Sequence, residues 1–336
     1  MKKSLVFISF LLVGLLTFSG CASEKKNSEN TTGKETMKAA LITATGGLGD
    51  RSFNDSAHEG FKRAKEELGV EIKVIEPQST ADYLQSLKLA ANADYDLIMV
   101  VGNDWDDALN TVVPNYPDKK FAAVNVKSEA DNLAVAQFAD HEGSFVVGAL
   151  ASLMSESGTV GFIGGMDVPG INRFAVGFEE GAKYANPDIK VIPTYVGSFA
   201  DPSKGKEFAI QLIGEGSDII FQAAGKSGEG LFEALKENDG VYGIGVDQDQ
   251  DYIVEGKVLT SMIKNVGNAA YDFIKQAKEG TFTSGVKVYG LAEEGVGMSE
   301  MKYTKDIIPA DVLEKVEAIR QEVIDGKVKV TDVFDK

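Results

Sequence analysis

Two phenylalanines, each following a serine in a glycine-containing turn, are the side chains best placed in this sequence to grip a flat ligand. Phe53 follows residues 46–52 (GGLGDRS), and Phe199 follows Gly197-Ser198. Two rings on opposite faces of a flat ligand could stack on it, each stack contributing about 1 to 3 kcal/mol. The alternative is that both rings pack as satellite core residues. We favour the clamp because both rings share the same glycine and serine context.

An acid and a lysine could supply the polar contacts. Asp247 ends an apolar run, and one carboxylate can accept hydrogen bonds from two sugar hydroxyls. Its segment, residues 245–251 (GVDQDQD), has some likeness to a calcium loop. Tyr252 and Val258, however, stand where that loop requires glycine and glutamate, so we expect no metal. Lys264 ends the next apolar run and could donate to the same ligand, although a surface lysine is the simpler interpretation.

A glycine-rich turn at residues 224–230 (AGKSGEG) could present backbone N–H groups of Gly225 to Ser227 to a polar ligand. It lacks the G-x-x-x-x-G-K-[ST] phosphate loop, and a plain strand-to-helix connection explains it equally well. Catalysis finds little support, because the chain has two histidines and one cysteine and no nucleophile paired with a base. We therefore predict a binding protein without a cofactor, not an enzyme.

These residues need a scaffold, and the hydrophobic pattern predicts one. Short, continuous apolar runs alternate with helical segments, which is typical of a doubly wound, mainly parallel sheet of the α/β class. The pattern restarts near residue 140, which predicts two lobes. We expect residues 38–139 with about 264–296 in the first lobe, and 140–263 with about 297–336 in the second. Ligands bind outside the carboxyl ends of such strands, where the motifs above lie.

The N-terminus has the features of a lipoprotein export signal. Lys2 and Lys3 precede an apolar run at residues 5–16, and Phe18-Ser19-Gly20-Cys21 follows, like a bacterial lipobox with phenylalanine in place of leucine. We predict a signal peptide at residues 1–20, lipid attachment at Cys21 and a polar tether over 21–37. This places the protein on the extracytoplasmic face of the cell membrane, held by the lipid only.

The charge of the chain excludes one class of partner. The full chain carries 34 basic and 51 acidic residues, and its formal net charge is −17. Loss of Lys2 and Lys3 with the signal peptide makes the chain more acidic still. Nucleic-acid binding needs clustered Lys and Arg, so we expect no nucleic-acid partner.

Taken together, several motifs resemble those of the basic membrane protein family. They are GGLGDRSFN at 46–54, FIGGM at 162–166, Gly197-Ser198-Phe199 and GVDQDQ at 245–250. The resemblance runs from about residue 38 to about residue 290. Members are lipoprotein receptors of ABC importers, and the best understood bind purine nucleosides. The resemblance implies a type I periplasmic-binding fold whose two lobes close over the ligand.

By this resemblance, Phe53 and Phe199 are the stacking rings, Asp247 the ribose acid and Lys264 a polar ligand contact. Trp105 could add a further ring. Two positions depart from the nucleoside receptors: Ala44 and Asn125 stand where acids are usual. The predicted ligand-binding residues are Phe53, Asn54, Trp105, Asn125, Phe199, Gly225, Ser227, Asp247 and Lys264.

The sequence thus predicts a monomeric surface lipoprotein that binds a small solute, best fitted by a purine nucleoside, and passes it to an ABC importer permease. Another flat heteroaromatic ligand, such as riboflavin or a free nucleobase, is the alternative within the same class. A sensor that uses the same fold without transport is a further alternative.

Overall fold

Two six-stranded sheets organise residues 36–102 and 104–335, the part of the chain that the computed structural model describes. The first has the order β11-β5-β4-β3-β1-β2 and is parallel throughout. The second has the order β12-β10-β9-β8-β6-β7, and only β12 runs antiparallel. This confirms the predicted α/β fold. The predicted signal peptide, Cys21 and all but the last two tether residues lie outside the described residues.

The strands are short and follow the predicted apolar runs closely. Their bounds are β1 Lys38–Ile42, β2 Glu71–Ile75, β3 Leu97–Val101, β4 Lys120–Val124, β5 Leu133–Phe138, β6 Thr159–Gly164, β7 Lys190–Tyr195, β8 Ile219–Ala223, β9 Tyr242–Asp247, β10 Val258–Lys264, β11 Gly285–Tyr289 and β12 Val296–Met298. The sequence pattern did not indicate β12, because three residues are too few to show a period.

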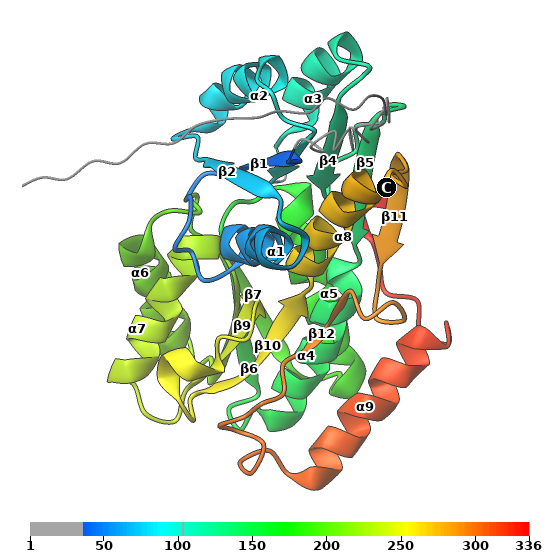
Figure 1. The fold of residues 1–336 in the computed structure, drawn as a ribbon. Helices are drawn as coiled ribbons and strands as arrows, with labels where there is room; N and C mark the ends of the chain where they lie inside the picture. The colour runs from blue at the N-terminus through cyan, green and yellow to red at the C-terminus, as the bar shows by residue number, and fades with distance from the viewer. Residues whose placement is uncertain (1–35, 103, 336) are drawn as a thin grey trace, which may run out of the picture. The chain divides into compact units, whose positions relative to one another are not determined.

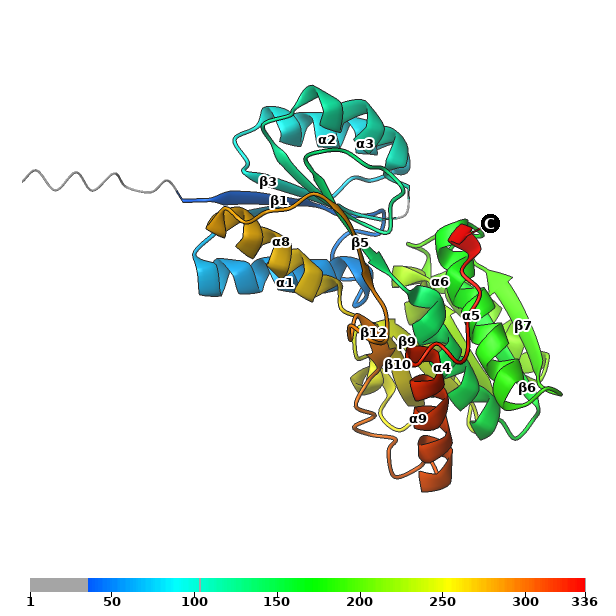
Figure 2. The same cartoon turned by 90° about the vertical axis from the view of Figure 1, so that its right-hand side faces the viewer.

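Helices cover both faces of each sheet (Figures 1 and 2). On the first sheet, α1 and α8 pack together on one face, and α2 and α3 lie on the other. On the second, α4 pairs with α5 and α6 with α7, and α9 packs on α4. Their bounds are α1 Phe53–Leu68, α2 Tyr83–Asn92, α3 Asp106–Val112, α4 Asp140–Met154, α5 Pro169–Ala185, α6 Pro202–Gly214, α7 Glu229–Glu237, α8 Val266–Glu279 and α9 Ala310–Ile324. Among the described residues, no helix is both long and apolar enough to cross a membrane.

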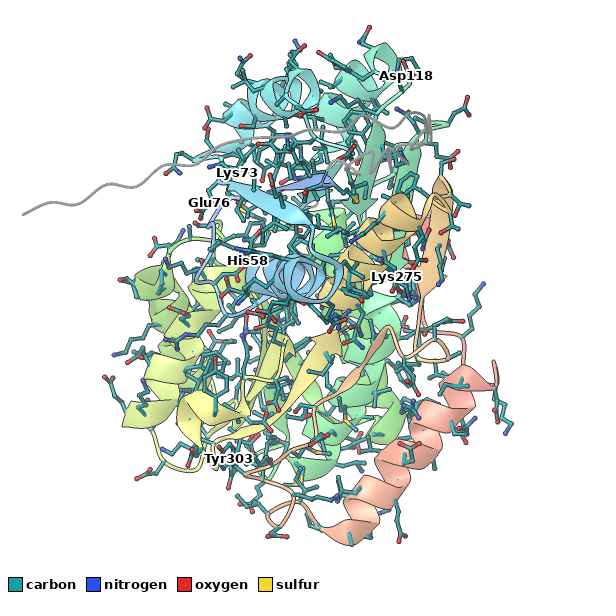
Figure 3. The ribbon with its side chains drawn as sticks, viewed as in Figure 1. His58, Lys73, Glu76, Asp118, Lys275 and Tyr303 are labelled. Carbon is teal, nitrogen blue, oxygen red and sulfur yellow. The ribbon has the colours of Figure 1, made fainter. Side chains whose placement is uncertain are left out.

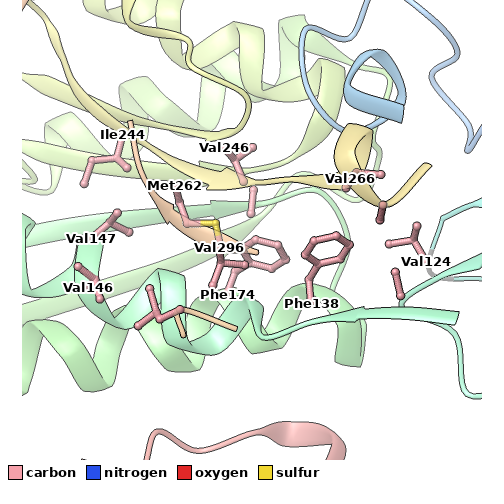
Figure 4. Packing of buried hydrophobic residues seen from close by; sticks show 14 of the residues in the cluster. Val124, Phe138, Val146, Val147, Phe174, Ile244, Val246, Met262, Val266 and Val296 are labelled. Atoms are coloured by element: carbon pink, nitrogen blue, oxygen red, sulfur yellow. The ribbon is translucent and has the colours of Figure 1, made fainter. Parts of the chain in front are cut away.

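The central strands read as unbroken apolar runs because helices bury them from both sides. All five residues of β3 are buried, for example. Phe61 on α1 and Phe178 on α5 are also fully buried, and burying a side chain of this size stabilises a fold by about 1.5 to 3 kcal/mol. Figure 4 shows part of this packing, in which Phe138 at the end of β5 lies beside Phe174 on α5.

The chain passes between the two sheets three times. It leaves the first sheet after β5, returns from β10 into α8, and leaves again between β11 and β12. We propose that each sheet with the helices packed on it is one lobe, and we use the terms first and second lobe in that sense. Two charged residues mark these passages: Asp140 opens α4, and Lys264 ends β10.

Candidate functional site

A pocket with about 640 Å³ of empty volume lies where the carboxyl ends of the strands of both sheets meet. The first lobe contributes Ala44, Thr45, Asp50, Phe53, Asn54, Tyr83, Gly102 and Asp104, and the second contributes Ile171, Phe174, Phe199, Ala223, Gly225, Lys226, Val246, Asp247 and Lys264. A second pocket, of about 850 Å³, borders α1 and α8 and shares Asp247 and Lys264. Only the first contains the two predicted stacking rings.

The β1–α1 loop positions Phe53 by placing it at the first turn of α1. Asp50, which is 2% exposed, accepts hydrogen bonds from the backbone N–H groups of Ser52, Asn54 and Asp55 at 2.9 to 3.1 Å. Its carboxylate therefore satisfies donors that a helix N-terminus leaves without partners. Asn54 in turn accepts from Ala44 N at 2.9 Å. These bonds fix the loop against the end of β1.

The glycine turn of this loop is held from the neighbouring strand. Gly46 and Gly47 have φ of +106° and +62°, which side chains with a Cβ rarely adopt. Glu76, just after β2 and labelled in Figure 3, accepts a hydrogen bond from Leu48 N at 2.8 Å. The backbone conformation of the glycines and the bond to Glu76 therefore fix the shape of this turn.

The second ring, Phe199, is held by glycine and serine. A Cβ at Gly165 would lie 2.3 Å from the Phe199 ring, so glycine is needed there to make room. Ser227 is fully buried; its hydroxyl donates to Ser198 O at 2.8 Å and accepts from Asp201 N at 2.9 Å. Ser227 thus anchors the loop that carries the ring, and the structure gives it this supporting position rather than one in the pocket lining.

Asp247 is the acid of the second lobe that reaches the pocket. It is 7% exposed, ends β9 with φ of +66°, and accepts a hydrogen bond from the hydroxyl of Ser52 in the first lobe. Burial raises the pKa of Asp247 to about 6, against the opposing effects of Lys264 and the Ser52 hydroxyl. The carboxyl is therefore mostly ionised at pH 7 and keeps acceptor capacity for a ligand.

Lys264 is nearly buried, with 3% of its side chain exposed, which overturns the surface-lysine interpretation. Its Nζ lies 5.0 Å from the centroid of the Phe53 ring and 3.0 Å from Oδ1 of Asp140. A buried, paired ammonium group next to a pocket can donate to a polar ligand.

The pocket thus includes Phe53, Asn54, Phe199, Gly225, Asp247 and Lys264 among the predicted residues, but not Trp105, Asn125 or Ser227. Trp105 is fully buried and stacks on Tyr83, with ring centroids 3.8 Å apart, while its Nε1 donates to Val101 O. The ring that faces the pocket is therefore Tyr83. Asn125 donates to Asp140 Oδ2 at 2.6 Å and accepts from Phe138 N at 2.8 Å. Trp105 and Asn125 therefore lie behind the residues that line the pocket.

Several lining residues were missed by sequence reasoning. Tyr83 and Phe174 lie at helix positions where an apolar residue is read as core, so no local signal marks them. Asp104 follows β3, and burial followed by the charge of Asp106 raises the pKa of its carboxyl. Its place three residues beyond the end of β3 was the one signal that could have found it. Within residues 36–102 and 104–335, no three His, Cys, Asp or Glu side chains are grouped to hold a metal ion.

Comparison with known proteins places this architecture in a family. The model of the family described as ABC transporter substrate-binding protein PnrA-like matches residues 37–333. The chain belongs to this family. Relatives of the chain include proteins named "ABC transporter nucleoside-binding protein BmpA" from Lactococcus lactis subsp. cremoris and "Basic membrane protein A" from Borreliella burgdorferi. The first is 34% identical over 98% of this chain and 99% of its own length. The second is 37% identical over 88% and 87%.

A solved structure with a similar fold supports this family assignment. It is that of an ABC transporter system solute-binding protein from Aeropyrum pernix K1, which matches with a TM-score of 0.82 and 31% identity over 88% of this chain and 93% of that one. The fold and family are therefore those of an ABC substrate-binding protein, as the sequence motifs predicted.

Proposed function

We propose that this protein is a surface receptor that binds a purine nucleoside in the pocket between its two sheets and delivers it to an ABC importer. The observation that carries the proposal is one pocket that combines two phenylalanine rings, one from each lobe, with a buried acid and a buried lysine. The name of the Lactococcus relative, which refers to nucleoside binding, supports the same ligand class.

Each group has a role that fits a nucleoside. Phe53 and Phe199 would stack on the base. Asp247 would accept from the two ribose hydroxyls, and Lys264 would donate to a ribose oxygen. Hydroxyl pairs suit a carboxylate because its two oxygens can each accept a hydrogen bond.

Asp104 is a pocket acid that could replace the one usual at position 44, where this chain has alanine. Ala44 lines the pocket, and a Cβ placed on Gly102 would be 3.2 Å from the Ala44 Cβ, so the ends of β1 and β3 adjoin there. Asp104, two residues beyond Gly102, lines the same pocket. We propose that it accepts from a ring N–H of the base in place of the usual acid.

Calorimetry tests the function directly, with guanosine, adenosine, guanine and riboflavin as ligands. We expect the wild type to bind a nucleoside more tightly than guanine or riboflavin. Phe53→Ala and Phe199→Ala should each weaken every ligand by about tenfold to a hundredfold. Asp247→Ala should weaken nucleosides by roughly 30- to 1,000-fold and guanine little.

Matched controls keep the result specific. Asp249→Ala removes an exposed acid two residues from Asp247, and Tyr252→Ala removes an exposed ring outside the pocket lining. Neither should change affinity.

Binding of riboflavin or guanine without nucleosides would establish the alternative ligand class, and normal discrimination of nucleoside from base in Asp247→Ala would refute the ribose assignment. A sensor would bind ligand yet support no uptake with the importer genes present.

The lipid anchor is also a proposal, because Cys21 lies outside the described residues. It rests on Phe18-Ser19-Gly20-Cys21 after an apolar run, and on the membrane-protein name of the Borreliella relative. Cys21→Ser should move the protein from the membrane fraction to the soluble or unprocessed fraction. Continued lipid labelling of that variant would rule out attachment at Cys21. We further propose that the receptor acts as a monomer.

A further inference from the structure

Asp140 is a fully buried carboxylate at the point where the chain first passes from one lobe to the other. Three side chains from distant parts of the chain converge on it. Lys264 Nζ lies 3.0 Å from Oδ1 and 3.2 Å from Oδ2, and Asn125 donates to Oδ2 at 2.6 Å. Arg173 Nη1, on α5, is farther from Oδ2, at 3.4 Å. The pocket lysine is thus held from behind by an acid that does not itself line the pocket.

Arg173 is the second buried cation of this cluster, and most of its bonds go elsewhere. Its Nε and Nη2 each donate to one oxygen of Asp332 at 2.8 Å, and Nη1 donates to Phe138 O at 2.6 Å. His141 Nδ1 lies 3.2 Å from Nη2. Burial and Arg173 lower the pKa of His141, so the ring is neutral and can accept from the guanidinium.

Asp332 belongs to the C-terminal segment Thr331–Asp335, which lies against both lobes. Thr331 N donates to Glu180 on α5 at 2.9 Å. The Phe334 ring lies 4.5 Å from the Arg173 guanidinium and 4.9 Å from Nζ of Lys127, which follows β4 of the first sheet. Although burial opposes it, hydrogen bonds from Arg173 and Phe334 N hold the pKa of Asp332 below its usual value, so it is a carboxylate at neutral pH.

We propose that Asp140 is a positioning residue for Lys264, and that the C-terminal segment keeps it available by holding Arg173 through Asp332. Two ion pairs lie close together here: Lys264 pairs with Asp140, and Arg173 pairs mainly with Asp332. An arginine fork binds a carboxylate through two parallel bonds, and a buried charge left without a partner is strongly unfavourable. Without Asp332, Arg173 turns to Asp140 and competes with Lys264 for it.

The consequence is a link from the C-terminus to the ligand site. Lys264 released from Asp140 leaves its position beside the Phe53 ring, and the polar side of the pocket changes while the stacking rings stay in place. This inference rests on the proposed function only in treating Lys264 as a ligand contact, so it can be tested with and without a ligand.

The ligand-free test measures how fast each lysine is labelled by an amine-reactive reagent, read by mass spectrometry, in the full chain. Asp332 is accessible to substitution without disrupting a core, because 17% of its side chain is exposed. Asp332→Asn should raise labelling of Lys264 severalfold. Asp332→Glu, which keeps the carboxylate, and Asp335→Asn, an exposed acid three residues on, should leave it unchanged. Exposed Lys315 is the internal reference.

Unchanged labelling of Lys264 in Asp332→Asn would overturn the proposal. Asp140→Asn should raise the labelling further; if that variant does not fold, Asp332→Asn alone decides.

The ligand test separates positioning from general damage. Asp332→Asn should weaken a nucleoside about tenfold, as for loss of one hydrogen bond to a charged group, and leave guanine unchanged. Equal losses for nucleoside and base would indicate a merely structural role and overturn the proposal. If the wild type binds no nucleoside, the proposed function fails, and the labelling result still decides whether Asp332 and Asp140 position Lys264.

Discussion

Asp50 and Asp247 line the same pocket from opposite lobes, are both nearly buried, and differ in how their oxygens are used. Each oxygen of Asp50 accepts two hydrogen bonds from its own loop: Oδ1 from Ser52 N and Asp55 N, and Oδ2 from Asn54 N and Nδ2. Asp247 accepts a bond from the Ser52 hydroxyl, and its other oxygen faces no such set of backbone donors. Burial raises the pKa of both carboxyls.

From this difference we infer that Asp50 maintains the fold, and we propose that Asp247 is kept for a ligand. Both carboxylate oxygens of Asp50 accept hydrogen bonds at the first turn of α1. Asp50 therefore stabilises the loop and has little acceptor capacity left for a ligand. Asp247 is held in a costly position with acceptor capacity to spare, as expected of a group that serves binding rather than stability. The same substitution, aspartate to asparagine, should therefore have opposite effects at the two sites.

Asp247→Asn should give the largest change, a gain in stability at neutral pH. The pKa of Asp247 is raised from 3.8 to about 6. The folded state therefore holds this proton more tightly than the unfolded state, and the wild type loses stability as pH rises from about 4 to about 6. That difference corresponds to about 3 kcal/mol at 1.36 kcal/mol per unit, so ligand-free Asp247→Asn should gain up to this amount at pH 7.5 and almost nothing at pH 4. Urea unfolding at both pH values measures it.

A loss of stability for Asp247→Asn at pH 7.5 would contradict the comparison, since it would make this acid a fold-maintaining group like Asp50. Asp118→Asn, at an exposed position that lines neither pocket, is the control and should show no such pH dependence.

Asp50→Asn should act in the opposite direction with a somewhat smaller effect. The amide group that replaces one carboxylate oxygen would point its N–H bonds at two N–H donors of the loop. Leaving such donors unsatisfied should lower the free energy of unfolding by roughly 2 kcal/mol. Urea unfolding at pH 7.5 measures it, and exposed Asp94 provides the control as Asp94→Asn. An unchanged midpoint would mean that the loop does not depend on its buried acid.

Ser52→Ala should give the smallest effect and tests the bond that joins the two regions. The Ser52 hydroxyl is one of the groups that lower the pKa of Asp247. Removal of this hydroxyl should raise the pKa of Asp247 further, by up to about one unit, so the midpoint of the Asp247 titration moves to higher pH. The ¹³C shift of the Asp247 carboxyl, identified by its absence in Asp247→Asn, reports it. Ser198→Ala, at the corresponding serine before Phe199, should leave the titration in place.

The sequence by itself determined the fold class and the positions of most strands and helices. Continuous apolar runs between helical segments are local signals, because a strand buried on both faces needs apolar residues at every position, as β3 shows. Glycine-containing turns before Phe53 and Phe199 were equally local, since a turn with positive φ selects glycine whatever surrounds it. The resemblance to the family implied that Asp247 and Lys264 accompany these rings in a ligand site.

Tertiary structure alone decided which side chains line the pocket and which support them. Trp105 and Tyr83 are separated by 22 positions yet stack in parallel, and only their three-dimensional order shows that tyrosine is the one at the pocket. Lys264 looks like a surface lysine in the sequence and becomes a buried, paired cation only through Asp140, 124 residues away. Asp332 joins the same cluster from the C-terminal end. Burial and charge pairing are properties of neighbours in space, and residues this far apart in the chain carry no local pattern that announces them.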